Sequence, residues 1–475
     1  MRNRRIPVWL AVVAASIPVF MASLDNLVVT SALPVIHERL GASVEDLQWI
    51  TNAYTLSFAA LMLLAVTLGD RFGRRHLFVA GIAVFTAASA LAALSIEPWQ
   101  LIVARAVQGV GGAAVMPLSL TLLAASVSAR LRPLAIGIWG GIAGLGVALG
   151  PLIGGAVVEG WSWEAIFWIN VPIGVVAAAL ALVALPNSFG ARVRADLVGV
   201  ALAGLGILAL VFGIVRGNDA GWGSLQVAGS LAVGGVLVGA FVWWESRFDA
   251  PLLPLRLFRD RGFTVANIVG LTFSFGAFGS VFILIQFLQV VQGHSPLTAG
   301  LMTMPWTLAP MVVAPLAGVF SGRLGTRALT VAGLTSLSLG IFWIGFTMSA
   351  DVAYLALLPG FILAGIGMGL VFAPISTAVL ANMAPDDHAK ASGANSTLRE
   401  IGVALGIAVL TAVFTGSGGT LSPTGYVDAA IPAVLVGAGV LAAAALIALL
   451  MPAGKRADVP VDDIIVEEGL LVSAQ

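Results

Sequence analysis

A charged octapeptide, Leu68-Gly69-Asp70-Arg71-Phe72-Gly73-Arg74-Arg75, separates two long apolar stretches of the chain. A second octapeptide, Phe320-Ser321-Gly322-Arg323-Leu324-Gly325-Thr326-Arg327, does the same in the second half. The aligned copies share an arginine (Arg71 and Arg323), a glycine (Gly73 and Gly325) and a basic residue (Arg75 and Arg327), while Gly322 replaces Asp70. A repeat at this distance predicts that the chain is built from two related halves.

The apolar stretches around these octapeptides set the class of protein. Of the 475 residues, 59% are hydrophobic and 10% are charged, whereas a soluble domain carries about 25% charged residues. The chain therefore lacks the polar groups to coat a water-facing surface, and lipid is the solvent that fits. The net charge of zero gives no support to nucleic-acid binding. The absence of cysteine excludes disulfides, thiolate metal sites and cysteine nucleophiles.

Fourteen stretches are long enough to cross a bilayer as helices, which takes about 20 apolar residues each. They lie near 8–35, 47–68, 76–96, 99–127, 133–158, 163–185, 195–215, 224–244, 262–291, 297–321, 328–348, 353–380, 393–415 and 428–451. The octapeptides follow the second and tenth stretches, eight spans apart. We therefore expect an all-α membrane protein with a six-helix bundle (1–186), two inserted helices and a linker (187–260), a second six-helix bundle (261–452) and a mobile tail (453–475).

The distribution of basic residues gives the orientation. If the N-terminus is cytoplasmic, nineteen of the 23 basic residues fall in cytoplasmic segments, and only Arg39 and Arg216 fall in outer loops. This is a strong positive-inside bias, so both termini are predicted to be cytoplasmic. A cleavable signal peptide over the first twenty residues is the alternative. We prefer a retained helix, because the apolar pattern continues through Asp25 to Pro34.

One acidic residue, Asp25, lies deep in the first span. A charge in the middle of a bilayer costs about 2.5–3.5 kcal/mol, so such residues usually face the protein interior or water. Asp25 is therefore a candidate proton carrier whose charge would also attract a cationic substrate. The alternative is an acid near the outer mouth that only hydrogen-bonds a neighbouring helix.

Two arginines and a second acid also lie within spans. Arg105, in the fourth span, cannot release its proton, so it either pairs with an acid or binds backbone carbonyls. Arg399 shares a helical stripe with Gly402 and Gly406, which predicts close packing against another helix. Glu400 points about 100° away from Arg399 and is the second candidate for coupling or substrate binding.

Further polar and aromatic residues are candidates for lining a substrate cavity. They are Asn26, Asn52, Tyr54, Gln108, Phe278, Gln286, Gln289 and Asn395. The phenylalanines of the ninth span, including Phe273, Phe282 and Phe287, are expected mainly to face lipid. Its two glutamines are expected to face a cavity, because a site for varied drugs needs apolar walls with a few polar groups.

Several motifs in order carry a resemblance to a known family. The loop after the second span contributes Leu68, Asp70, Arg71, Gly73, Arg74 and Arg75, with Val66 in place of the usual opening glycine. The fourth span contributes Arg105, Gln108, Gly109 and Gly111, and the fifth contributes Gly137, Gly146, Gly150, Pro151, Gly154 and Gly155. The sixth contributes Trp161, Trp163, Phe167, Asn170 and Pro172, and the thirteenth contributes Gly393, Asn395, Arg399, Gly402 and Gly406. With these residues the chain resembles the fourteen-span drug:proton antiporters of the major facilitator superfamily.

The resemblance implies a proton-coupled antiporter in the bacterial inner membrane. It would export amphipathic, cationic drugs or natural products by alternating access, as a monomer, with protons as the coupling ion and no other cofactor. The charged loop would act as a gate, with Asp70 pairing across the interface between the halves, or would serve topology alone. The glycines of the fifth span would pack it tightly and seal one side.

Alternatives to export by antiport remain open. Within transporters they are a proton symporter and an exporter of an anionic or lipid-like metabolite. Outside transporters they are a membrane enzyme or a lipid-handling scaffold, which would need converging catalytic residues that the sequence does not show. A Walker phosphate loop is absent from the sequence, so ATP is not expected to drive the protein. The four histidines, His37, His76, His294 and His388, lie at helix ends or loops and predict no metal site.

Overall fold

The computed structural model describes residues 7–128, 131–190, 195–249, 251–383 and 387–452. Within these ranges the chain is helical, and 14 helices are long and apolar enough to cross a membrane, which confirms the predicted count. The first six spans are α1 (Val8–Leu40), α2 (Val44–Phe72), α3 (Arg74–Ala93), α4 (Pro98–Ser126), α5 (Arg132–Gly160), and α6 (Ala165–Trp168) with α7 (Asn170–Ala184). The two inserted spans are α8 (Leu197–Ala220) and α9 (Leu225–Glu245). The last six follow η1 (Leu255–Arg259) and are α10 (Arg261–Gln286) with η2 (Phe287–Val291), α11 (Pro296–Leu324), α12 (Thr326–Thr347), α13 (Tyr354–Leu380), α14 (His388–Gly416) and α15 (Val427–Ala448).

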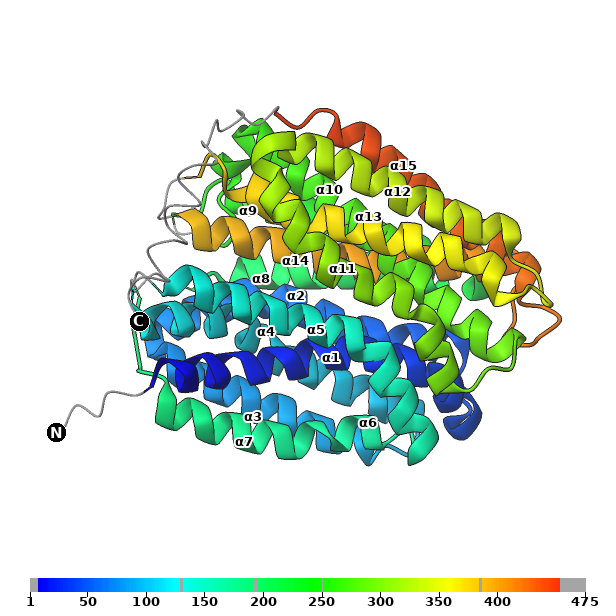
Figure 1. Ribbon diagram of the computed structural model, residues 1–475, viewed down its shortest axis with the longest axis horizontal. Helices are drawn as coiled ribbons and strands as arrows, with labels where there is room; N and C mark the ends of the chain where they lie inside the picture. Colours follow the sequence, from blue (N-terminus) through cyan, green and yellow to red (C-terminus); the bar gives the residue numbers. More distant parts are fainter. Residues whose placement is uncertain (1–6, 129–130, 191–194, 250, 384–386, 453–475) are drawn as a thin grey trace, which may run out of the picture.

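The helices form two bundles with the inserted pair beside them (Figure 1). In the first bundle, α1 packs on α5, and α4 packs on α2 and α3. In the second, α10 packs on α14 and α15, and α13 packs on α11 and α12. The bundles meet where α5 contacts α11 and where α2 contacts α14. We call the end that holds the α2–α3 connection the basic end, and the other the opposite end.

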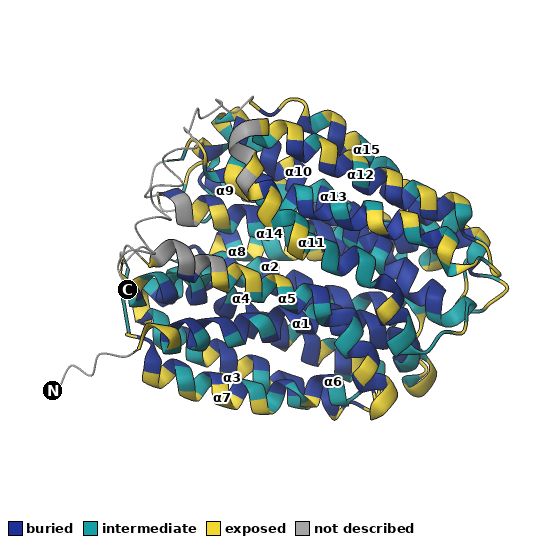
Figure 2. Ribbon diagram, viewed as in Figure 1, coloured by how far each residue is buried: buried dark blue, intermediate teal, exposed yellow. Residues whose placement is uncertain are grey.

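Exposed apolar side chains cover the outward faces of the bundles, where yellow and blue residues alternate along single helices (Figure 2). Val175 and Val183 on α7 and Phe346 on α12 are among the exposed large side chains. A surface of this kind is stable against lipid and not against water. In the most hydrophobic window of α9, only 11% of the residues are buried, so this inserted helix is the most peripheral span.

Three glycines spaced by four residues let α5 approach α1. A Cβ added at Gly146 or Gly154 would lie 2.8 Å from a backbone oxygen of α1, and one at Gly150 would lie 2.6 Å from the Cβ of Leu27. Gly155 instead lies against the backbone of Pro296, at the start of α11. The motif of the fifth span thus joins α5 to its own bundle on one face and to the second bundle on another. The surroundings of Gly137 lie outside the described part.

The bundles are in close contact at the opposite end. A Cβ at Gly300 of α11 would lie 2.5 Å from the carbonyl oxygen of Pro151, and Gln289 donates to the Ser31 carbonyl oxygen of α1 at 2.9 Å. Toward the basic end of α5, by contrast, a Cβ at Gly141 or Gly144 would meet no atom within 4 Å. Among the described residues, the close approach of α5 and α11 therefore lies at the opposite end.

For Phe273, Phe282 and Phe287, the expectation that the phenylalanines of the ninth span face lipid is wrong. Phe273, Phe282 and Phe287 are 1%, 2% and 1% exposed, because α10 lies in the middle of the second bundle between α13, α14 and α15. Lipid tails and a helix-bundle core are equally apolar, so the residue type alone does not distinguish them. The sequence correctly predicted an apolar environment for these side chains, but it did not predict that this environment is the interior of the bundle.

Candidate functional site

A buried polar cluster lies inside the first bundle and is centred on Asp25. Asp25 of α1 pairs with Nη1 of Arg105 on α4, and both side chains are almost completely buried, at 1% and 0% exposed. Oδ1 of Asp25 also accepts hydrogen bonds from Gln108 and Asn170, each at 2.8 Å. Ser89 of α3 completes the group by accepting from Gln108 at 2.8 Å and from Asn170 at 3.3 Å. These five residues, from four spans, are called the Asp25 cluster below.

Arg105 connects this cluster to α2. Its Nε donates to the carbonyl oxygen of Ile50 at 3.2 Å, and its guanidinium lies 4.3 Å from the ring centre of Tyr54. Nη1 also donates to Gln108 at 2.6 Å, whereas Nη2 is buried and unpaired. The guanidinium therefore binds both an acid and a backbone carbonyl, the two roles that the sequence left open.

Asn170 and Ser89 were not predicted as site residues, although Asn170 belonged to a quoted motif. Asn170 begins α7, directly after the break that separates α7 from α6. The available signal was a single amide in an otherwise apolar span, since uncompensated polar groups are expensive in lipid. Tyr54 and Gln108, predicted as possible cavity residues, lie inside the first bundle, where Tyr54 is 2% and Gln108 0% exposed.

In the second bundle, Arg399 is packed between two helices. Its guanidinium lies 4.4 Å from the ring centre of Phe372 on α13, and its aliphatic stem borders Gly270 on α10. One turn earlier, Asn395 donates to Asn267 of α10 at 3.1 Å. Gly402 and Gly406 lie directly against the α10 backbone. The predicted stripe of α14 thus faces α10.

Glu400 lies on a different face of α14. Its Oε2 is buried and accepts no hydrogen bond. Its helix, α14, is the helix of the second bundle that packs against α2. Glu400 is therefore an acid with a buried carboxylate oxygen on the α14 helix that packs against the first bundle.

Unpaired polar atoms follow one face of α2. Asn52 is completely buried, and both its amide nitrogen and its amide oxygen lack a hydrogen-bond partner, as does Oε1 of Gln48 one turn earlier. A buried unpaired polar group costs about 1–3 kcal/mol. Such groups are satisfied when water or a ligand reaches them, so this face is a candidate for contact with substrate in another conformation.

The remaining predicted cavity residues have mixed surroundings. Asn26 and Phe278 are half-buried, on α1 and α10 respectively. Gln286 is buried and donates to the Phe282 carbonyl oxygen of its own helix at 2.9 Å. Of the two glutamines, Gln289 alone has a hydrogen bond to the other bundle among the described contacts.

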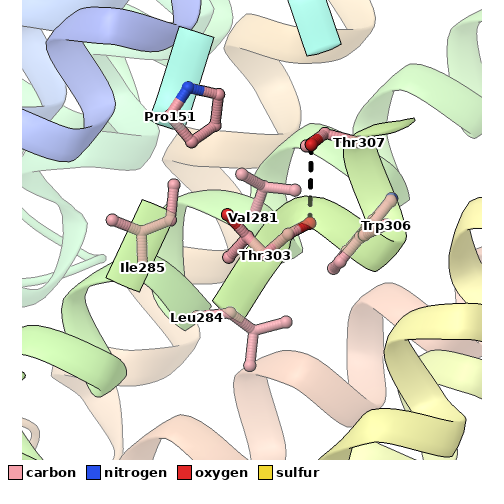
Figure 3. A pocket seen from close by; sticks show the side chains of 7 residues that line it. All are labelled: Pro151, Val281, Leu284, Ile285, Thr303, Trp306 and Thr307. Carbon is pink, nitrogen blue, oxygen red and sulfur yellow. Dashed lines mark hydrogen bonds between the residues drawn. The ribbon is translucent and has the colours of Figure 1, made fainter. Parts of the chain in front are cut away.

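A small apolar cavity lies between the bundles (Figure 3). It is lined by Pro151 of α5, Val281, Leu284 and Ile285 of α10, and Thr303, Trp306 and Thr307 of α11. The hydroxyls of both threonines donate to backbone oxygens of α11, Thr303 to Gly300 and Thr307 to Thr303. The cavity therefore offers mainly hydrocarbon, beside the α5–α11 contact that closes the opposite end.

The predicted gate residues contact their own half. Nε of Arg74 is 2.6 Å from Oδ1 of Asp70, and Nη1 of Arg75 donates to the Leu185 carbonyl oxygen at 3.1 Å. Gly73, at φ 105°, begins the turn between α2 and α3, and Arg71 lies over the ring of Phe72. In this conformation the described partners of the loop belong to the first bundle and to the segment that follows α7, and none belongs to the second bundle.

The comparisons with known proteins agree with this architecture. The model of the Major Facilitator Superfamily matches residues 15–407 and 268–462. The multidrug resistance protein Stp of Mycobacterium tuberculosis is 36% identical over 89% of this chain and 79% of that protein. The cephamycin export protein CmcT of Amycolatopsis lactamdurans is 38% identical over 87% and 86%, and the tetracenomycin C resistance and export protein of Streptomyces glaucescens is 33% identical over 90% and 79%.

Solved structures show the same fold at low sequence identity. A bacterial homolog of the human lysosomal transporter Spinster, in an inward-facing and unoccupied conformation, has a TM-score of 0.66 at 15% identity and covers 95% of this chain and 98% of its own. The human organic anion transporter MFSD10 has a TM-score of 0.63 at 17% identity over 93% and 99%. Two six-helix bundles, the buried charges within them and the matches in sequence and structure all lead to one conclusion: this multi-pass membrane protein is a transporter of the major facilitator superfamily.

Proposed function

We propose that this transporter exports amphipathic, cationic drugs or natural products in exchange for protons by alternating access. The observation that carries the proposal is the completely buried Asp25–Arg105 pair between α1 and α4. The names of its relatives, which include multidrug resistance and antibiotic export proteins, support export as the direction. The proposed setting is the bacterial inner membrane with both termini in the cytoplasm, and the proposed working unit is a monomer that uses no ATP.

The pair can couple protonation to conformation because each charge depends on the other. Protonation of Asp25 would remove the counter-charge of Arg105, and breaking a buried ion pair costs about 3–5 kcal/mol. A helix arrangement in which Arg105 finds other partners would then be favoured. Proton binding thus shifts the balance between two conformations, which is the requirement for driving transport.

The energetics are sufficient for export. Exchange of two protons for one monovalent cation moves one net charge inward, which gains roughly 3.5 kcal/mol across a membrane potential of ~150 mV and corresponds to a concentration ratio of a few hundredfold. Substrate would bind between the bundles, beside the unpaired groups of Asn52 and Glu400, with the apolar side chains around Trp306 as a further wall of the site. The carboxylate of Glu400 favours a cation there.

The test uses purified protein in proteoliposomes with an internal pH dye and a panel of lipophilic cations and lipophilic anions. Wild type, Asp25→Asn and the matched control Asp351→Asn are compared, since Asp351 is an exposed acid of the α12–α13 connection. Proton movement opposite to the substrate, lost in Asp25→Asn and kept in the control, supports the proposal. Movement in the same direction would establish a symporter. Equal coupling in Asp25→Asn would transfer the role to Glu400 or another acid, and a response to anions alone would overturn the cationic substrate class.

A further inference from the structure

The inserted helix α8 contacts both bundles near its end. Nη1 of Arg216 forms an ion pair with Oε2 of Glu45, in the first turn of α2, at 2.9 Å. Two residues later, Asn218 donates to the Ala412 carbonyl oxygen at 2.6 Å and to the Thr415 hydroxyl at 2.7 Å, both on α14. Arg216 therefore binds the first bundle and Asn218 the second, within one turn of α8 and at the opposite end.

The orientation of Asn218 is itself fixed. Its Oδ1 accepts a hydrogen bond from Nε1 of Trp222 at 2.9 Å, in the turn that leads to α9. This bond orients the amide so that both N–H groups are available to α14. On the α14 side, Gly416 leaves room for the amide, because a Cβ there would lie 3.3 Å from it. The contact between Asn218 and α14 therefore depends on residues of both partners: Trp222 orients the amide, and Gly416 leaves room for it.

The chain before α8 is held at the basic end by the first bundle. Before α8, Asn187 accepts from the Arg75 backbone N–H at 3.2 Å, and Gly190 donates to the Asp70 carbonyl oxygen at 3.1 Å. This segment therefore follows the movement of α2 and α3.

The chain after α9 is held by the second bundle. Arg256 forms two hydrogen bonds with Asp387, at 2.8 and 2.6 Å, and these raise the pKa of Arg256 above its usual value. The connection before α8 is therefore bound to the first bundle, and the connection after α9 is bound to the second. When the two bundles separate, the inserted helices cannot move with both of them.

We propose that α8 is a clasp that holds the opposite end closed, with Arg216–Glu45 and Asn218–α14 as its two links. This inference rests on the alternating access of the proposed function and goes beyond it by giving the inserted helices a task. The links act in series, from α2 through α8 to α14. Separation of α2 from α14 at this end therefore requires one link to break, and only one.

The arrangement in series makes a distinctive prediction. Loss of a partly exposed ion pair in Arg216→Gln corresponds to about a two- to fivefold larger open population. Asn218→Ala removes the stronger link, the neutral hydrogen bonds, but it should enlarge the open population by the same factor, about two- to fivefold, because the unmodified protein already opens by breaking the weaker ion pair. Once the weaker link is gone, however, removal of the other adds nothing. The double variant should therefore open no further than the more affected single variant.

The experiment measures the distance between spin labels at the opposite end of the full-length protein in lipid. Because the natural chain has no cysteine, Ser162→Cys and Asp351→Cys introduce the only two labelling sites, one on each bundle. The long-distance population is compared among the unmodified clasp, the two single clasp variants and the double variant. Asp219→Asn is the matched control, since Asp219 is an exposed neighbour in the same turn.

Two further measurements separate the clasp from misfolding and from failure of the proposed function. Size-exclusion profiles and thermal stability identify variants that do not fold, and exchange of the charges in Glu45→Arg/Arg216→Glu should restore the closed population. The label distance reports the conformation without any substrate or proton gradient, so it tests the clasp even if transport is not proton-coupled. An unchanged distance distribution in both single variants overturns the proposal. A double variant whose effect equals the product of the single effects also overturns it, because that describes two independent contacts.

Discussion

Removal of either charge from the Asp25–Arg105 pair should destabilise the protein more than removal of both. Asp25→Asn keeps the shape of the side chain but leaves Arg105 completely buried without a counter-charge. Arg105→Gln leaves Asp25 with only the amide donors of Gln108 and Asn170. Breaking a buried pair from one side costs about 3–5 kcal/mol in the free energy of unfolding.

The double variant Asp25→Asn/Arg105→Gln contains no unpaired charge, only neutral groups with imperfect hydrogen bonds. We expect it to be more stable than either single variant, so the coupling energy should exceed the effect of one single variant, that is, about 3 kcal/mol or more. Equilibrium unfolding by SDS in mixed micelles, followed by the fluorescence of the 12 tryptophans, gives the four free energies of the cycle.

The Asp70–Arg74 pair is the matched control for this cycle. Its two residues lie only four positions apart, across the turn between α2 and α3, and their side chains are 22% and 23% exposed. A pair of this kind contributes about 0.3–0.5 kcal/mol, so its cycle should show almost no coupling. If the single effects at Asp25 and Arg105 instead add to within about 0.5 kcal/mol, the two residues act independently, and the coupling mechanism built on them is wrong.

Three other predictions follow from the packing and the unpaired groups. Gly150→Ala should lower stability by about 1–3 kcal/mol, as judged from the same unfolding assay, because its Cβ would overlap Leu27. Gly141→Ala, where a Cβ meets nothing within 4 Å, should instead be neutral or stabilise by about 0.5–1 kcal/mol; equal losses at both glycines would contradict the packing argument. Glu400→Gln should leave stability unchanged, since Oε2 has no hydrogen-bond partner. It should reduce the uptake of a lipophilic cation into inverted vesicles about tenfold relative to the uptake of a neutral analogue. An equal reduction for both substrates would show that Glu400 does not recognise the charge of the substrate.

The sequence predicted the number of spans because a bilayer imposes a minimum apolar length on every helix. It also predicted that α14 packs closely against another helix, since Gly402 and Gly406 share a stripe with Arg399, and the structure identifies that helix as α10. It did not predict the break between α6 and α7, because hydropathy measures composition and not continuity of the helix. The break places Asn170 at the start of α7, where it reaches Asp25.

Partners that are distant in the sequence were beyond prediction. Asp25 lies 80 residues from Arg105 and 145 from Asn170, and the spacing within one helix does not determine which neighbour a polar side chain meets. The role of α8 was equally hidden. Arg216 was visible only as one of two basic residues on the outer side, whereas its significance depends on Glu45 and on Asn218 two residues away.

The position of the Asp25 cluster limits how protonation can affect substrate. All the partners of Asp25 among the described residues belong to the first bundle, so a change of charge there has to reach the interface through movement of a helix. The helix α2 is suited to this, because Arg105 holds Ile50 and Tyr54 on one side. Asn52, two residues from Tyr54, projects about 200° away around the helix. A small rotation of α2 would therefore change the surroundings of Arg105 and of the unpaired Asn52 amide together, so the proposed coupling of protons to substrate would run through α2.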